Sequence, residues 1–147
     1  MVKRIILFSV LLFVVGFCTY DLFLQLVLPQ SANLKFDIAS LDAQLINQLR
    51  FGAVIALFPW VYWMVSKLGK ITTRKGRLFV ALTLVATVIL SLLLWYVLLM
   101  PAISWMEGYQ SGVETHIDLS NFELEIFMMG GMLVGAVLAF AMFRGKS

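Results

Sequence analysis

The stretch Lys67–Arg77, K-L-G-K-I-T-T-R-K-G-R, decides how the rest of the chain is arranged. It contains five of the eleven Lys and Arg residues of the 147-residue sequence, and long apolar runs flank it on both sides. A short basic segment between two such runs is typical of a cytoplasmic loop between membrane helices, because Lys and Arg are retained on the inner side. Once this loop is placed inside, the sidedness of every other segment follows.

The overall composition supports a membrane protein. Hydrophobic residues make up 62% of the sequence and charged residues 13%, and the mean hydropathy is +0.98. Soluble domains average about 45–50% apolar and about 25% charged residues. A single soluble core of this size cannot cover so much apolar surface, whereas lipid can. We therefore expect one integral membrane domain over residues 1–147.

Four apolar segments are long enough to cross a bilayer, since about 20 apolar residues are needed for a spanning helix. We expect spans at about residues 5–28, 45–66, 78–100 and 122–143. Proline cannot donate a backbone hydrogen bond, so Pro29 and Pro101 are expected to end the first and third helices and Pro59 to kink the second.

The helix starts and loops complete the predicted topology. Ser40 is a plausible N-cap for the second helix, and Ser120 with Glu123 fits a capping box for the fourth. Residues 30–39 and 102–119 form two outer loops, and no strand is evident. The predicted fold is an all-α, four-helix transmembrane bundle with N-in/C-in topology, two outer loops and one short basic inner loop. Each half has a span, an outer loop and an Asp before the next helix (Asp37 and Asp118), which raises the hypothesis of an internal duplication.

The distribution of charge agrees with this topology. Nine of the basic residues fall on the expected inner side, and all eight acidic residues fall toward the outer side; only Lys35 and Arg50 break the pattern. The asymmetry is explained by topology and requires no nucleic acid partner. The first span is expected to stay uncleaved, because Phe17 precedes Cys18 where lipoprotein processing needs a small residue. We therefore expect a bacterial inner (cytoplasmic) membrane protein with both termini in the cytoplasm.

Two residue counts restrict the possible chemistry. Cys18 is the only cysteine, so an internal disulfide and the oxidoreductases that use paired cysteines are excluded. His116 is the only histidine, so a bis-histidine haem site within one chain is excluded as well. We expect no cofactor and no metal site.

Ionisable residues inside the membrane segments are the candidates for a ligand site or an ion pair. Asp21 and Arg50 are predicted to lie at the same height on neighbouring antiparallel helices, with Gln25 one turn beyond Asp21. Such residues are costly in lipid unless they are paired or hydrated. Three alternatives remain open: a structural ion pair, plain interfacial residues, and a ligand or proton site. Glu125 could face Arg50 across the bundle or face water.

Small residues suggest where helices pack. Gly131, Gly135 and Ala139 recur every fourth position in the last span, which leaves a groove that another helix can approach closely. Gly52 and Ala56 form a weaker version that could be the matching face. The partner of the groove could be a helix of the same chain, a second copy, or another protein.

These features favour a non-enzymatic integral membrane interaction protein. It would be an accessory or assembly subunit of a larger membrane complex, or an immunity-type protein that binds another membrane protein. The groove and the acidic outer loops would be its contact surfaces, and no serine has a base at a spacing that suggests catalysis. The alternative is a small oligomeric transporter or channel that uses Asp21, Arg50 and Glu125, since a buried carboxylate suits proton coupling.

Overall fold

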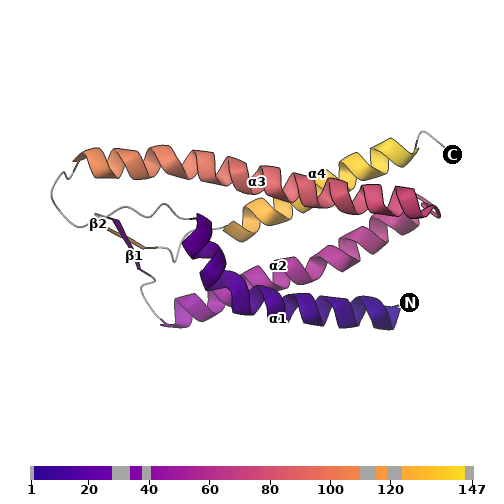
Figure 1. The fold of residues 1–147 in the computed structure, drawn as a ribbon, viewed down its shortest axis with the longest axis horizontal. Coiled ribbons are helices and arrows are strands. Elements are labelled where there is room, and N and C mark those ends of the chain that lie inside the picture. The colour runs from indigo at the N-terminus through magenta and orange to yellow at the C-terminus, as the bar shows by residue number, and fades with distance from the viewer. Residues whose placement is uncertain (1, 28–33, 38–40, 110–114, 119–123, 145–147) are drawn as a thin grey trace.

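A computed structural model describes residues 2–27, 34–37, 41–109, 115–118 and 124–144 of the chain. The elements follow one another in the order helix, strand, helix, helix, strand, helix (Figure 1). Their bounds are α1 Val2–Val27, β1 Leu34–Asp37, α2 Leu41–Leu68, α3 Arg74–Tyr109, β2 Thr115–Asp118 and α4 Leu124–Arg144.

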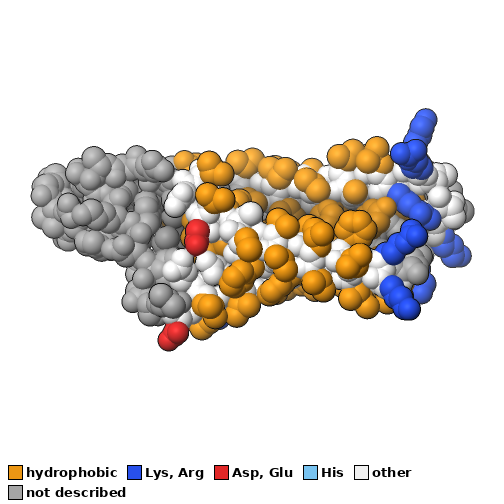
Figure 2. Space-filling view, turned by 60° about the horizontal axis from the view of Figure 1, so that its bottom comes forward, with side chains coloured by type: hydrophobic (Ala, Val, Ile, Leu, Met, Phe, Trp, Pro, Cys, Tyr) orange, Lys and Arg blue, Asp and Glu red, His pale blue; other side chains and the backbone are white. Residues whose placement is uncertain are grey.

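Four helices are long and apolar enough to cross a membrane, which confirms the all-helical class with four candidate membrane helices. The apolar stretches run over Val2–Leu26, Asp42–Leu68, Arg74–Leu99 and Leu124–Phe143. Most of their apolar side chains point away from the bundle, and Figure 2 shows them covering its middle. Lipid is the medium that accepts such a surface, since a soluble monomer rarely exposes one so large.

Two predictions about the third helix and the loops were wrong. Pro101 lies inside α3, which continues to Tyr109 instead of ending at the proline. Proline removes one backbone N–H and crowds the preceding turn, but the residues on both sides keep their own helical bonds, so a long helix can contain it. The predictions that fall on Pro29, Ser40 and the Ser120–Glu123 capping box lie outside the described residues.

The second correction is a pair of strands where the sequence suggested none. β1 and β2 pair in parallel, from Leu34 opposite Thr115 to Asp37 opposite Asp118. Four residues are too few to show an alternating pattern, and the partner strand comes from a remote segment, so single-sequence reasoning misses it. Both halves of the chain now have the order helix, strand, helix. The ladder aligns Asp37 with Asp118, the two residues that suggested a duplication.

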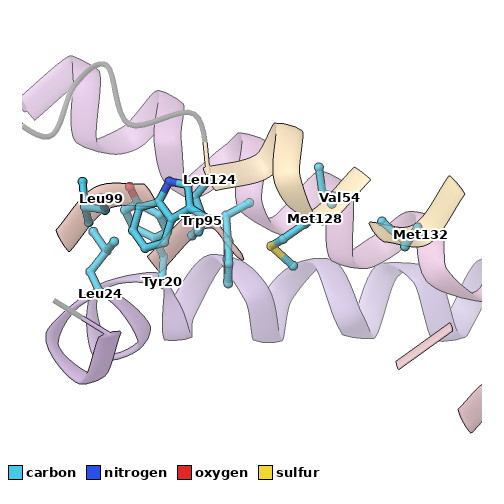
Figure 3. Close-up of a cluster of buried hydrophobic side chains, with 9 residues drawn as sticks. Tyr20, Leu24, Val54, Trp95, Leu99, Leu124, Met128 and Met132 are labelled. Carbon is cyan, nitrogen blue, oxygen red and sulfur yellow. The ribbon is translucent and has the colours of Figure 1, made fainter. Parts of the chain in front are cut away.

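The helices pack as two hairpins. α1 lies mainly along α2, α3 lies mainly along α4, and contacts between α2 and α4 join the hairpins. One cluster of buried side chains lies toward the strands and draws on all four helices; it includes Tyr20, Phe51, Trp95 and Leu124 (Figure 3). A second cluster, around Leu84, lies toward the α2–α3 turn. The bundle therefore has a core at each end of its length.

The α2–α3 turn ends one helix and starts the next within a few residues. The Lys70 N–H bonds the Lys67 carbonyl at 3.2 Å and the Ile71 N–H bonds the Ser66 carbonyl at 3.0 Å. This is the Schellman pattern, and Lys70 takes the left-handed position that usually holds glycine, with a φ of 49°. Thr73 then caps α3, because its Oγ1 accepts the Gly76 N–H at 3.2 Å.

Charge separates along the bundle. Both termini and the α2–α3 turn lie at one end, and the strands lie at the other (Figure 1). Figure 2 shows Lys and Arg side chains gathered at the end with the termini, and the described acidic side chains toward the strand end. We refer to these below as the basic end and the strand end.

Candidate functional site

Asp21 is held by two amides from the neighbouring helix. The Gln44 Nε2 donates to both carboxylate oxygens of Asp21, at 3.2 Å each, and the Gln48 Nε2 donates to Oδ2 at 3.0 Å. Gln44 and Gln48 are four residues apart on α2, so their side chains share one helix face. The carboxylate of α1 is therefore satisfied by neutral donors at the strand end of the bundle.

Arg50 pairs with Glu125 of α4 rather than with Asp21. The Arg50 Nη1 lies 3.5 Å from Glu125 Oε1, and the Arg50 side chain is 57% exposed while that of Glu125 is 14% exposed. The geometry of α2 explains the choice: Arg50 follows Gln48 by two positions, and residues two apart point to different sides of a helix. Of the arrangements left open by the sequence, Arg50 facing Glu125 is the one in the structure.

Asn47 lies on α2 between these two sets of contacts. Its side chain is 4% exposed, and within the described part of the chain its Nδ2 has no hydrogen-bond partner. The buried Tyr20 of α1 lies close to it, and the Tyr20 ring packs edge-on against Phe51 at 5.4 Å between centroids. Tyr20 is therefore the neighbour best placed to accept a hydrogen bond from the Asn47 amide.

We call Asp21, Gln44, Asn47, Gln48, Arg50 and Glu125 the polar layer. Gln25, the remaining predicted ligand candidate, is exposed on α1, and among the described residues no hydrogen bond joins it to Asp21. Gln44 and Gln48 were not singled out from the sequence. Their spacing of four in the amphipathic start of α2 is the signal that could have identified them.

The small residues of α4 lie against α3. A Cβ built on Gly131 would come within 2.8 Å of the Thr87 carbonyl oxygen and 2.9 Å of the Val88 Cα. Gly135 similarly faces Leu84, at 3.2 Å from its Cα. Ala139 is fully buried. The groove predicted on the last span is therefore filled by a helix of the same chain.

Gly52 packs against a different helix. A Cβ built on it would come within 2.9 Å of the Phe13 carbonyl oxygen of α1, and one built on Gly16 would lie 3.0 Å from the Gly52 Cα. Gly52 therefore contacts α1 and does not complement the Gly131 groove; Ala56, one turn on, is partly buried. Gly16 is the matching small residue, and it was not singled out from the sequence.

The described hydroxyl groups are mostly bonded to backbone. Thr19, Thr83 and Thr87 donate to carbonyls of their own helices, and Ser91 donates to the Phe127 carbonyl on α4. None of these hydroxyls is bonded to a base that could activate it. In the described part of the chain, no group of three or more His, Cys, Asp or Glu residues could hold a metal ion.

Comparison with protein-family models, with curated proteins and with solved structures finds no match to this chain. The fold itself defines a class: an all-helical protein with four helices able to cross a membrane. Within that class, its distinguishing features are the polar layer and the parallel ladder at the strand end.

Proposed function

We propose that the chain is a non-enzymatic integral membrane interaction protein that binds a partner at its strand end. It would serve as an accessory or assembly subunit of a larger membrane complex, or as an immunity-type protein that binds another membrane protein. The observation that carries this proposal is the parallel ladder, which joins two separate loops into one two-stranded surface.

The ladder is suited to recruiting a further strand. Among the described residues, β1 pairs only with β2, so each strand has one edge without a strand partner there. A strand edge carries a row of N–H and C=O groups that pairs readily with an extended segment of another chain. Two strands alone are also only marginally stable in water, and a third would stabilise them.

The helix packing moves the expected contact surface away from α4. Gly131, Gly135 and Ala139 are buried against α3, so they are not available to a partner. The exposed apolar side chains of the helices face lipid in a membrane protein and need no protein partner. The strand end is where the ladder and the polar layer are close together.

We further propose that the basic end faces the cytoplasm, so that both termini and the α2–α3 turn lie inside and the strands outside. The support is the positive-inside rule, since the Lys and Arg side chains gather at this end (Figure 2). A bacterial inner membrane would suit this arrangement. Cysteines placed at the two ends and labelled with a membrane-impermeant reagent in intact cells test it, and labelling from outside at the basic end would contradict it.

The test of partner binding is gentle extraction from the native membrane, followed by measurement of mass and composition. A defined second protein is the expected result. Lys35→Pro and Phe36→Pro then test whether the partner binds the unpaired edge of β1. Successive backbone N–H groups point to opposite sides of a strand, so the two prolines remove N–H groups from different edges. One of the two variants removes an N–H from the free edge and leaves the ladder bonds of β1 intact. Retention of the partner by both variants would contradict binding at this edge.

A small oligomeric transporter or channel is the second candidate, supported by the buried Asn47 amide and Tyr20 beside the carboxylates of Asp21 and Glu125. Buried polar groups of this kind can bond a permeating polar solute or water. A homodimer without other proteins after extraction would favour this function. Proton-coupled flux in reconstituted vesicles should then fall in Asp21→Asn, and equal flux in the variant and the wild type would remove Asp21 from the coupling path.

A further inference from the structure

A cleft opens at the basic end between α1, α2 and α3. It consists of two adjoining cavities of about 480 and 410 Å³ that share Tyr62 and Trp63 of α2 as a common wall. The packing of the bundle explains it, because α1 lies mainly along α2 and α3 lies mainly along α4. The first and third helices are thus left without extensive contact, and both volumes fall within the range of small-molecule sites, about 300–1,000 Å³.

The larger cavity is lined mostly by apolar side chains. Phe8 and Leu12 of α1, Phe58 and Pro59 of α2 and Ala81 of α3 contribute to its wall. These residues belong to the helix segments expected to lie in lipid. A cavity of this kind accepts a hydrocarbon chain and excludes a hydrated group. Its one charged lining residue is Arg4, near the start of α1.

The smaller cavity is basic. Lys67, Lys70 and Arg77 line it together with Ser66. The Lys67 Nζ lies 4.9 Å from the centre of the Trp63 ring, and the Arg77 Nε donates to the Ile71 carbonyl at 3.2 Å. These contacts hold two of the cationic groups at the mouth of the cleft. The buried Ser66 Oγ has no hydrogen-bond partner among the described residues, so the wall also offers an unpartnered hydroxyl.

Among the described residues, no Asp or Glu lines either cavity. No Asp or Glu occurs before Asp21, between Phe51 and Met106, or after Glu125. The described acidic side chains lie toward the strand end (Figure 2). Four cationic residues around one cleft therefore favour an anion from outside the chain, and a phosphate group accepts charge-assisted hydrogen bonds from Arg and Lys.

We propose that the cleft binds one anionic glycerophospholipid. Its phosphate group lies among Arg4, Lys67, Lys70 and Arg77, and an acyl chain occupies the cavity between Phe8, Phe58 and Ala81. The proposed lipid site uses only some of the basic residues that indicate the membrane topology. Arg74 and Lys75 are basic and exposed at the same end, but they do not line either cavity. It is also separate from the proposed partner surface, which lies at the strand end.

Native mass spectrometry of the full chain in a neutral detergent tests the site, with phosphatidylglycerol compared with phosphatidylcholine of the same acyl chains. We expect a preference of about tenfold or more for phosphatidylglycerol, because both lipids present a phosphate but phosphatidylcholine adds a quaternary ammonium that the cationic rim repels. Lys67→Gln with Arg77→Gln should abolish the preference. Arg74→Gln with Lys75→Gln removes the same charge from the same end and should keep it.

Binding of the acyl chain in the larger cavity is tested separately. Ala81→Trp fills the cavity and should weaken phosphatidylglycerol binding about tenfold or more, while Ala86→Trp on the exposed side of α3 should leave it unchanged. Glycerol phosphate tests the same point without a substitution, and it should not compete. Equal binding of the two lipids, equal losses in the two charge-removing variants, or competition by glycerol phosphate would each overturn the proposal.

Discussion

Gly130 and Gly131 are adjacent on α4 but have opposite surroundings, so replacing each with alanine should change stability in opposite directions. A Cβ at Gly130 would meet nothing within 4 Å. Replacing an exposed helical glycine with alanine stabilises a helix by about 1 kcal/mol, so Gly130→Ala should raise the free energy of unfolding by that amount.

At Gly131 the same gain in helix propensity is opposed by a steric clash. The added Cβ would come within 2.8 Å of the Thr87 carbonyl oxygen and 2.9 Å of both the Val88 Cα and the Ser91 Cβ. Two of these are backbone atoms, so α3 and α4 must move apart. Overpacking of this kind costs about 1–3 kcal/mol, and Gly131→Ala should therefore be less stable than Gly130→Ala by about that difference.

Reversible unfolding in mixed detergent and SDS micelles, followed by circular dichroism, measures this difference. The two variants share composition, helix and propensity gain, so each is the control for the other. A larger side chain should enlarge the effect, and Gly131→Leu should fold poorly while Gly130→Leu should not. If Gly131→Ala were as stable as Gly130→Ala, close packing of α3 on α4 at this position would be refuted.

Three further predictions concern the turn and the polar layer and use the same unfolding assay. Thr73→Ala removes the cap of α3 and should lower stability by about 1 kcal/mol, whereas Thr73→Ser should not. Lys70→Gly relieves the left-handed backbone at a φ of 49° and should raise stability by up to about 1 kcal/mol, and a loss would contradict the Schellman assignment. Gln48→Leu leaves the Asp21 carboxylate with fewer donors and should cost about 1–3 kcal/mol, while Arg50→Ala should cost less than about 1 kcal/mol because its side chain is mostly exposed. Equal losses in these last two variants would refute that ranking of the contacts.

The four spans could be predicted because a bilayer imposes a length and a composition that any sequence window reveals. The pattern of apolar residues does not determine where a helix ends beyond the apolar segment. Pro101 predicts the end of the third helix, yet α3 continues to Tyr109. A proline weakens one turn only, and whether the helix resumes depends on what the following residues pack against.

In the candidate site, the sequence also identified individual residues but not the contacts between them. Asp21, Arg50 and Glu125 were identifiable because charge within an apolar segment is conspicuous. Their pairing was not, since the rotation of α2 determines which side chains meet. Gln44 and Gln48 were not predicted as site residues, because neutral amides near the start of a helix are common. Gly16 escaped because a single glycine has meaning only beside Gly52, and that contact depends on how α1 and α2 cross.

The parallel ladder also determines the order in which the molecule can be assembled. Leu34 and Thr115 are about 80 residues apart along the chain, and α2 and α3 lie between them. During synthesis β1 therefore emerges long before its partner exists, and it waits unpaired until three helices have been inserted. The ladder can therefore form only after α2 and α3 have been made, and until then the edge of β1 is open to pairing with other extended segments.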